Sequence, residues 1–481
     1  MSTKSTKIVA TISDLNCEVD FIQQLFNEGM NVVRMNSAHL QREGFLKIIN
    51  NVRAVSNQIA ILMDTKGPEV RTTVVENDEM QLRTGDTVKV TGKPDIISTP
   101  ECIAVNYPYF VRDLNVNDDI LFDDGEIHVK VVSKDDEYLH CVVQNDGVLG
   151  SRKSVNVPGV RINLPSLTEK DKANILFAIE CDLDFIAHSF VRNKQDLLDI
   201  QKILDEHNSS IKIISKIENQ EGVDNIDQIL EHTYGVMIAR GDLGIEVPQE
   251  KIPGIQRRLI RKCVQAQKPV IVATQMLHTM IKNPRPTRAE ITDIANAIYY
   301  RTDALMLSGE TAYGKYPVEA VRTMAKVAME AEKTKLAEND IPIPISTSDI
   351  TSFLANAAVD ASTKIGTKAI ITDTFSGKTA RHLAAYRGTN PILAICYHER
   401  STRELALSYG VFPMFQTEKG NTQQYFMSGL QKLIKNGFLQ KEDYVSYLSG
   451  SFGEGFGTTF LEVNRIDKIL ESRDKYLLPN F

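Results

Sequence analysis

Short apolar runs alternate with longer amphipathic stretches over the first two thirds of the chain. Helix-like spacing of apolar residues is seen, for example, over 18–28, 193–206, 250–267, 287–300 and 316–335. Between such segments, eight apolar runs of strand length lie at 7–12, 31–35, 59–64, 184–190, 211–217, 235–240, 269–274 and 303–308. Eight strands alternating with helices predict an α/β fold, a (β/α)8 TIM barrel whose active site forms at the strand ends.

The alternation is interrupted between the third and fourth runs. Residues 68–158 contain many short β-like runs, separated by turn sequences such as T-G-D, N-D-D, D-D-G and N-D-G. We expect a small β-barrel domain inserted in a barrel loop, because a structureless loop of this length would be unusual. A long decorated loop is the alternative.

A second α/β pattern follows a connector with two prolines at 338–352. Its strand-like runs lie at 369–373, 392–397, 411–415, 444–448 and 459–463, and they predict a C-terminal α/β domain with a mostly parallel sheet. The predicted domains are therefore the barrel at 1–67 and 159–338, the inserted β-rich domain at 68–158, and the C-terminal domain at 339–481.

Polar residues stand at the ends of the apolar runs. Lys216 and Glu218 are two apart, so they share one face of a strand, and Asp242 follows the next run. Two carboxylates from adjacent strand ends suit a hard divalent cation such as Mg²⁺. A purely structural Lys–Glu ion pair is the alternative for the first two residues alone. The recurrence of polar chemistry at further strand ends favours a functional site, with Arg34, Asn36, His39, Asp64, Thr65, Lys66, Glu69, Arg71, Gly241, Thr274, Gln275, Ser308 and Glu310.

Composition narrows the class of protein. The net charge is −7, whereas a general nucleic-acid binder is usually basic, so no nucleic-acid partner is expected. Six scattered cysteines argue against a disulfide framework or a zinc site and fit a reducing cytoplasm. No apolar stretch approaches the roughly 18 residues of a membrane span, and no signal peptide is evident. We therefore expect a cytoplasmic protein without a membrane partner.

The motifs at the strand ends closely resemble those of the pyruvate kinase family. The resemblance is strong over residues 5–340 and moderate beyond. It rests on M-N-V-V-R-M-N (30–36), M-D-T-K-G-P-E-V-R-T (63–72), L-P-S-L-T-E-K-D (164–171), I-S-K-I-E-N (214–219), M-I-A-R-G-D-L-G-I-E (237–246), V-A-T-Q-M-L (272–277) and L-M-L-S-G-E-T-A-Y-G-K-Y-P (305–317). The family implies transfer of the phosphoryl group of phosphoenolpyruvate to ADP, giving pyruvate and ATP, by a homotetramer that uses Mg²⁺ (or Mn²⁺) and K⁺.

The resemblance also assigns roles to residues of this chain. Lys216 would stabilise the transferring phosphoryl group, and Glu218 and Asp242 would bind Mg²⁺. The substrate would be held by Arg34, Gly241, Asp242 and Thr274, with Arg34 and Thr274 also counted as catalytic. The nucleotide would be faced by Arg71, Lys153 and His39. The K⁺ ligands would be Asn36, Asp64 and Thr65, and the candidates for a proton relay are Ser308 and Glu310.

Two departures from the family pattern change what we expect of the K⁺ site and of the effector. Ala38 stands where the family has a serine whose hydroxyl binds K⁺, so we expect K⁺ activation with weaker affinity. An inward-turned Ser37 or a bound water could replace the missing hydroxyl.

The C-terminal domain has a turn at a helix start that suits a phosphate, although it is not a Walker A motif. Its residues are Thr374, Ser376, Gly377, Lys378 and Thr379. Because the late loop at 450–457 carries Glu454 and no tryptophan, we expect a monophosphate effector or none.

Two rival functions are weaker. Another barrel enzyme of phosphoenolpyruvate or pyruvate would lack the β-rich insertion together with the nucleotide-facing Arg71 and Lys153. A non-catalytic or regulatory paralogue would be expected to have lost Lys216 or one of the metal carboxylates, and all of them are present.

Overall fold

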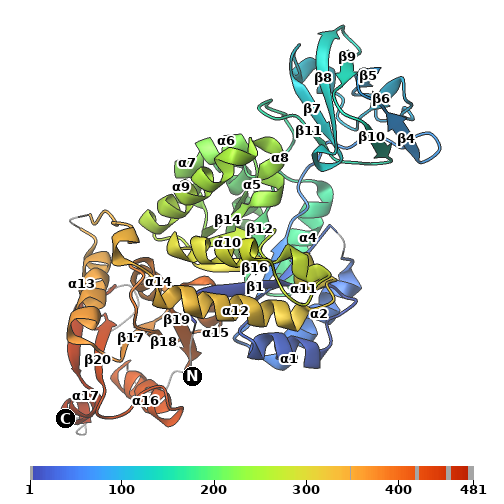
Figure 1. The fold of residues 1–481 in the computed structure, drawn as a ribbon. Coiled ribbons are helices and arrows are strands. Elements are labelled where there is room, and N and C mark those ends of the chain that lie inside the picture. The colour runs from blue at the N-terminus through green and yellow to red at the C-terminus, as the bar shows by residue number, and fades with distance from the viewer. Residues whose placement is uncertain (1–3, 39, 347, 418–421, 451–456, 475–481) are drawn as a thin grey trace.

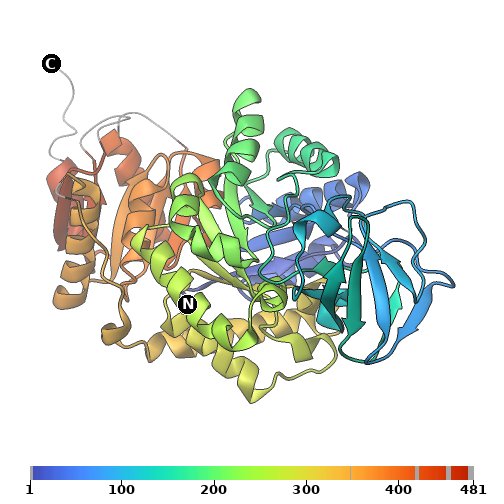
Figure 2. The same ribbon diagram turned by 90° about the horizontal axis from the view of Figure 1, so that it is seen from above.

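The computed structural model describes residues 4–38, 40–346, 348–417, 422–450 and 457–474. Three parts lie in a row, with the barrel in the middle (Figures 1 and 2). The β-rich insertion lies at one end of this row and the C-terminal domain at the other. The limits of the domains at 67/68, 158/159 and 338/339 stay predictions.

The central part is a closed barrel of eight parallel strands, in the order β1-β16-β15-β14-β13-β12-β3-β2. This confirms the fold class expected from the alternation of strands and helices. The strands are β1 (Lys7–Thr11), β2 (Val32–Asn36), β3 (Ala60–Asp64), β12 (Phe185–His188), β13 (Lys212–Ile217), β14 (Gly235–Ala239), β15 (Val270–Ala273) and β16 (Ala304–Leu307).

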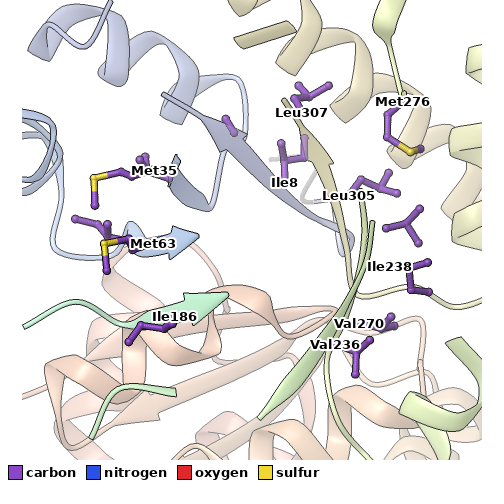
Figure 3. Packing of buried hydrophobic residues seen from close by; sticks show 14 of the residues in the cluster. Ile8, Met35, Met63, Ile186, Val236, Ile238, Val270, Met276, Leu305 and Leu307 are labelled. Atoms are coloured by element: carbon purple, nitrogen blue, oxygen red, sulfur yellow. The ribbon is translucent and has the colours of Figure 1, made fainter. Parts of the chain in front are cut away.

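Helices surround the strands and bury their outer faces. Figure 3 shows part of this layer, in which Ile8 of β1 lies beside Leu305 of β16, its partner in the strand register. The helices of the barrel are α1 (Val19–Asn27), α2 (Arg42–Val55), α4 (Glu169–Glu180), α5 (Lys194–Glu206), α6 (Gln220–Asp224), α7 (Ile226–His232), α8 (Arg240–Glu246), α9 (Ile252–Gln265), α10 (Arg288–Tyr299), α11 (Gly309–Ala312) and α12 (Pro317–Lys333), with 3-10 turns η2 (Gln249–Lys251) and η3 (His278–Ile281).

The inner faces of the strands form a separate apolar cluster. Alternate residues such as Val32, Leu62 and Ile214 fill the barrel interior. Because side chains alternate along a strand, the inward positions two residues further on are Arg34, Asp64 and Lys216. The same periodicity that packs the barrel therefore delivers charged groups to its carboxyl-terminal mouth.

The insertion is β-rich, as expected, and has its own apolar core. Strands β4 and β10 form a two-stranded sheet, and the other six strands form a sheet in the order β11-β7-β8-β9-β5-β6. The elements are β4 (Glu79–Leu82), β5 (Thr87–Thr91), β6 (Cys102–Ala104), α3 (Phe110–Asp113), β7 (Asp119–Phe122), η1 (Asp123–Gly125), β8 (Ile127–Lys134), β9 (Leu139–Val143), β10 (Gly147–Gly150) and β11 (Val155–Asn156).

The C-terminal domain has a five-stranded sheet in the order β19-β18-β17-β20-β21, parallel except for the β20–β21 pair. The mostly parallel sheet expected from the sequence is confirmed. The elements are η4 (Ala337–Asn339), α13 (Ile350–Ile365), β17 (Ala369–Thr374), α14 (Lys378–Ala385), β18 (Ile392–Cys396), α15 (Glu399–Glu404), η5 (Leu405–Leu407), β19 (Val411–Phe415), α16 (Thr422–Lys435), β20 (Tyr444–Ser449), β21 (Phe460–Arg465) and α17 (Ile466–Asp474).

Buried ion pairs attach this domain to the amino-terminal ends of the barrel strands. Arg387 Nη2 lies 2.5 Å from Asp303 Oδ2, just before β16. Arg403 Nε lies 2.5 Å from Asp184 Oδ1, just before β12. Leu407 of η5 joins the apolar cluster inside the barrel. The C-terminal domain therefore closes the end of the barrel opposite to the charged mouth.

The six cysteines are all free in the structure. No helix among the described residues is long and apolar enough to cross a membrane.

Candidate functional site

A cluster of buried charges lies at the carboxyl ends of β2, β3 and β13. The ammonium of Lys216 lies 2.9 Å from Glu218 Oε1 and 3.1 Å from Asp64 Oδ1. Only 9% of Lys216 is exposed, and the two acids are each 1% exposed. Unpaired charges would be costly at this depth, so each member needs the others or a ligand.

The titration of these groups follows from burial and from their neighbours. Burial works against the charge of Lys216, but Asp64 and Glu218 outweigh it and raise its pKa above the ordinary value. Burial would also raise the pKa of Asp64, but Arg34 and Lys216 lower it. For Glu218, burial dominates and raises the pKa despite the charge of Lys216, and the charge of Asp242 acts in the same direction as burial.

Arg34 is held rigidly beside Lys216. Its Nε donates to Asp64 Oδ2 over 2.7 Å, its Nη2 forms an ion pair with the same oxygen, and its Nη1 donates to Thr11 Oγ1 over 3.1 Å. A guanidinium oriented in this way can present its remaining donors to an oxyanion such as a phosphate.

Ser189 connects the cluster, although sequence reasoning did not identify it. Its hydroxyl accepts from Lys216 Nζ over 2.8 Å and donates to the carbonyl of Thr65 over 2.7 Å. It also lies 3.3 Å from Asp64 Oδ1. The only sequence signal was its position in the apolar run 184–190, because a lone serine at a strand end is also common in ordinary turns.

A second group of residues lies at the ends of β14 and β15. Thr274 has a left-handed backbone conformation with φ 68°, and its hydroxyl accepts from the backbone N–H of Gly241 over 2.7 Å. Arg240 Nη2 donates to the carbonyl of Thr274 over 2.7 Å, and Arg240 forms an ion pair with Asp293. Arg240 was not singled out from the sequence, yet it supports the strained turn at Thr274.

A short helix, α8, follows the sixth strand of the barrel and begins at Arg240. Asp242 lies in its first turn and lines a cavity of about 640 Å³ between the barrel mouth and the insertion. The carboxylate of Asp242 is close enough to Glu218 for its charge to raise the pKa of that residue.

The Glu218–Asp242 pair fits a divalent cation. Glu218 Oε1 has its ion pair with Lys216 but accepts no hydrogen bond from the described residues. A hard cation would relieve the burial cost of the Glu218 carboxylate and the repulsion between the two acids. Among the described residues, no three His, Cys, Asp or Glu side chains converge on a metal position. A cation at this pair would therefore take its other ligands from elsewhere, as Mg²⁺ does with substrate oxygens and water.

The three residues expected to hold a monovalent cation lie on neighbouring strand ends. Asn36 and Asp64 are direct partners in the β2–β3 register, and Thr65 follows Asp64. Ala38 offers no side-chain oxygen there. The hydroxyl of Ser37 is fully buried and has no hydrogen-bond partner among the described residues.

Glu310 and Ser308 lie together, as expected, at the end of β16. The two carboxylate oxygens of Glu310 accept from the backbone N–H groups of Leu277, over 3.1 Å, and of Ser308, over 2.8 Å. The hydroxyl of Ser308 is buried, and nothing in the described part of the chain bonds to it. Glu310 thus holds the loop after β15, and Ser308 keeps a hydroxyl available.

The residues expected to face a nucleotide belong to the insertion side of the mouth. Arg71 lines the 640 Å³ cavity and forms an ion pair with Glu69 over 2.5 Å. Lys153 lies outside the lining of that cavity, and its Nζ is 2.8 Å from Asp123 Oδ2. His39 lies outside the described residues.

The phosphate-binding turn expected in the C-terminal domain precedes helix α14. Gly377 has φ 75°, a conformation that favours glycine, and its N–H donates to Thr374 Oγ1 over 2.9 Å. The Thr379 hydroxyl lies 2.9 Å from that of Thr458. Ser376 and Lys378 are exposed. Glu454, on which the choice of effector partly depends, lies outside the described residues.

Comparison with known proteins gives a consistent result over the whole chain. The family described as "Pyruvate kinase, barrel domain" matches residues 3–321, and "Pyruvate kinase, alpha/beta domain" matches residues 352–463. The pyruvate kinase of Borreliella burgdorferi is 46% identical over 479 residues, which cover 98% of this chain and 100% of that protein. The pyruvate kinase of Geobacillus stearothermophilus is 44% identical over 478 residues, 97% of this chain and 81% of that one. The crystal structure of a pyruvate kinase from Cryptosporidium parvum superposes with a TM-score of 0.90 at 34% identity and covers 96% of both chains.

Proposed function

The chain belongs to the pyruvate kinase family, and from this premise we propose that the cluster around Lys216 is its phosphoryl-transfer site. The protein is a kinase that moves the phosphoryl group of phosphoenolpyruvate to ADP, giving pyruvate and ATP. The observation that carries the assignment of the site is the buried position of the Lys216 ammonium, within 3.1 Å of both Asp64 and Glu218.

Lys216 and Arg34 supply the positive charge for the transfer. Phosphoryl transfer depends on positioning and on neutralising charge more than on covalent chemistry. Lys216 stays protonated because its carboxylate neighbours raise its pKa. Arg34 is oriented by Asp64 and Thr11 and holds the phosphate of phosphoenolpyruvate. Fixed cations in a buried site cost little reorganisation when the charge shifts.

The carboxylate end of the substrate is held at the ends of β14 and β15. The N–H of Gly241 and the hydroxyl of Thr274 lie 2.7 Å apart, so an oxyanion bound at this position can contact both groups. Arg240 keeps the Thr274 backbone in place through its carbonyl. The enolate would receive its proton from a water or relay near Thr274. The outer members of this relay would be Ser308, whose hydroxyl has no partner among the described residues, and Glu310, which holds the loop after β15.

Two metal ions complete the proposal. Glu218 and Asp242 would hold Mg²⁺ (or Mn²⁺), and Asn36, Asp64 and Thr65 would hold K⁺. When bound, these ions supply further neutralisation of the phosphate charges. The carboxylate, amide and hydroxyl oxygens at the two positions support this assignment, as does Glu218 Oε1, which accepts no hydrogen bond from the described residues.

The insertion provides the nucleotide side of the site. Arg71, Lys153 and His39 would face the phosphates of ADP, and the 640 Å³ cavity lined by both Arg71 and Asp242 supports this placement for Arg71. Closure of the insertion over the mouth would exclude water, so that ADP rather than water receives the phosphoryl group. A cytoplasmic location, a homotetramer and a phosphorylated effector at Thr374, Ser376, Gly377, Lys378 and Thr379 remain expectations from the resemblance.

A coupled assay of pyruvate formation tests the assignment. Wild type, Lys216→Met and the surface variant Lys262→Met are assayed with phosphoenolpyruvate, ADP and Mg²⁺, with and without K⁺. Lys262 pairs with Asp227 on the outside of the barrel, so its variant controls for the loss of a lysine. We expect Lys216→Met to lower kcat by about a thousandfold or more, as removal of a charge that stabilises phosphoryl transfer does. Normal turnover in Lys216→Met would overturn the role of Lys216.

A further inference from the structure

The turn that follows strand β12 touches both charged residues at the end of β13. It consists of Ser189 and Phe190, and we call it the β12 turn. The hydroxyl of Ser189 accepts from Lys216 Nζ over 2.8 Å. The backbone N–H of Phe190 donates to Glu218 Oε2 over 2.7 Å. A turn of two residues therefore contacts the ammonium of one residue and the carboxylate of the other.

Phe190 has a backbone conformation that a large side chain disfavours. Its φ is 56°, in the left-handed region, where a residue as bulky as phenylalanine is a genuine outlier. Such strain persists only where the surrounding structure holds it in place. Here the strained turn directs the N–H of Phe190 to Glu218 Oε2, which leaves Oε1 to face Lys216. The orientation of the Glu218 carboxylate is therefore fixed from β12 as well as from its own strand.

The chain that leaves β3 is fastened to the β12 turn by three hydrogen bonds. The N–H of Thr65 donates to the carbonyl of Ala187 over 2.9 Å, and the N–H of Ser189 donates to Thr65 Oγ1 over 3.0 Å. The hydroxyl of Ser189 also donates to the carbonyl of Thr65 over 2.7 Å. These residues are all buried, so breaking the bonds would leave polar groups unsatisfied. We therefore expect the two segments to move together.

Gly67 extends this contact to the insertion. It precedes Pro68, at the predicted start of the insertion, and has φ 73°. A Cβ on Gly67 would lie 2.9 Å from Phe190 Cδ2 and 3.1 Å from Ser189 Cβ, so only a glycine allows the chain to pass this close to the β12 turn. Phe190 also lines the 640 Å³ cavity between the barrel mouth and the insertion. Direct contacts therefore lead from the insertion to the charged residues of the site.

The second connection between the barrel and the insertion makes no such contact. Gly159, at the other predicted limit of the insertion, has φ 77°, nearly the same conformation as Gly67. A Cβ on Gly159 would have no neighbouring atom of the described residues within 4 Å. Both glycines therefore provide the same backbone freedom, but only Gly67 packs against the β12 turn.

We propose that Ser189 and Phe190 are positioning residues for phosphoryl transfer, and that Gly67 couples them to the position of the insertion. This inference rests on the roles proposed above for Lys216 and Glu218, through which the turn acts. A shift of the insertion moves Gly67 against the turn, and the hydrogen bonds of the turn pass the shift to the two charged groups. Transfer is thereby tied to the closed position of the insertion, in which water is excluded from the mouth.

Steady-state kinetics of two glycine variants of the full-length protein test the coupling. Gly67→Ala and Gly159→Ala introduce the same strain at a left-handed residue, but only the first places a methyl group against the β12 turn. We expect Gly67→Ala to lower kcat at least tenfold and to change the KM for phosphoenolpyruvate less than threefold, because residues outside the turn hold the substrate. Gly159→Ala should stay within threefold of wild type in both constants.

A double-mutant cycle with Phe190→Gly identifies the contact. This change removes the ring against which a methyl group at position 67 would press. We therefore expect the loss of kcat caused by Gly67→Ala to be at least threefold smaller in the Phe190→Gly background than alone. Mn²⁺ binding to the substrate-free protein, measured by electron paramagnetic resonance, gives a readout apart from activity. Gly67→Ala and Phe190→Gly should each weaken it at least threefold, because Glu218 loses its fixed orientation, whereas Gly159→Ala should not.

A pair of serine variants tests the contact with Lys216. Ser189→Ala removes the hydroxyl that accepts from the ammonium. Ser215→Ala is the matched control, because Ser215 is equally buried and donates to Thr233 Oγ1 from the outer face of the neighbouring strand. Both variants lose a buried hydrogen bond, so thermal unfolding should show similar losses of stability. We expect only Ser189→Ala to lower kcat at least tenfold, again with little change in the KM for phosphoenolpyruvate.

Lys216→Met, measured in the same series, separates this inference from the assignment of the site. Normal turnover in Lys216→Met would overturn the site itself. If Lys216→Met is inactive while Gly67→Ala and Ser189→Ala behave like their matched controls, the positioning role is overturned and the site stands. Fully additive losses in the double-mutant cycle would overturn the coupling through Phe190. Circular dichroism confirms that each variant is folded, and if Gly67→Ala does not fold, the serine pair decides.

Discussion

Lys216 and Glu218 face one another across a gap of 2.9 Å, although only one residue separates them in the chain. Both are almost completely buried, and Glu218 Oε1 has no hydrogen-bond donor among the described residues. An ion pair of this kind contributes little to stability by itself, because burying both charges is costly. We propose that a substrate phosphate beside Lys216 and a cation beside Glu218 account for its position.

The variant Glu218→Gln tests the metal role of this pair. Replacing the carboxylate by an amide keeps the shape but removes the charge, so we expect the Mg²⁺ concentration for half-maximal activity to rise at least tenfold. The measurement is a Mg²⁺ titration of the coupled assay. Glu180→Gln is the control, because Glu180 pairs with Arg42 on the exposed outside of the barrel. An unchanged Mg²⁺ dependence in Glu218→Gln would contradict the assignment.

Ala38→Ser tests the cation site. We expect wild type to be activated by K⁺ and the variant to need roughly tenfold less K⁺, because one added ligand contributing about 1.4 kcal/mol changes an equilibrium tenfold. Activity is measured against K⁺ in Na⁺-free buffer. Full activity of wild type without K⁺ would refute the cation site, and an unaltered K⁺ curve for Ala38→Ser would remove position 38 from it.

Ser37→Ala is expected to stabilise the fold. The hydroxyl of Ser37 is fully buried and has no partner among the described residues, so its removal relieves a desolvation penalty of about 1 kcal/mol. Thermal unfolding of wild type and variant gives the comparison. If Ser37 instead turns to the cation, the variant will lose stability in K⁺ and require more K⁺ for activity.

The buried ion pair between Arg387 and Asp303 should be important for stability. Arg387→Met leaves Asp303 buried without its countercharge, which typically costs about 3–5 kcal/mol. Arg322→Met is the matched control, because the Arg322–Glu28 pair is partly exposed and such pairs contribute at most about 1 kcal/mol. Denaturant unfolding should show a clearly larger loss for Arg387→Met. Equal losses in the two variants would argue that the C-terminal domain does not depend on this contact.

Because His382 is buried, we expect the protein to lose stability in acid. Burial lowers its pKa to about 4, whereas in the unfolded chain the value is near 6.5. Between these pH values the unfolded state binds more protons, so the free energy of unfolding falls as the pH drops from about 6.5 to about 4. His382→Gln should flatten this part of the stability–pH profile, and His207→Gln, at an exposed site, should not. Identical slopes in all three proteins would contradict the prediction.

The barrel and most of the chemistry at its mouth could be predicted from the order of the residues alone. Side chains alternate in direction along a strand, so an apolar run of strand length predicts which of its residues face inward. Arg34 and Lys216 occupy inward positions near the ends of their runs. These signals are local, so they can be seen without knowing which strands are neighbours. The closed order of the eight strands then brings the ends of β2, β3 and β13 together.

Long-range packing, in contrast, selects the ordinary-looking residues that complete the site. Ser189 matters because β12 lies between β3 and β13, so its hydroxyl reaches both Lys216 and Thr65. A cavity of about 670 Å³ between the barrel base and the C-terminal domain depends on packing as well. Lys268 and Arg381 belong to different domains and have no shared sequence pattern. Long-range packing places these two cations together, and no periodicity along the chain encodes that contact.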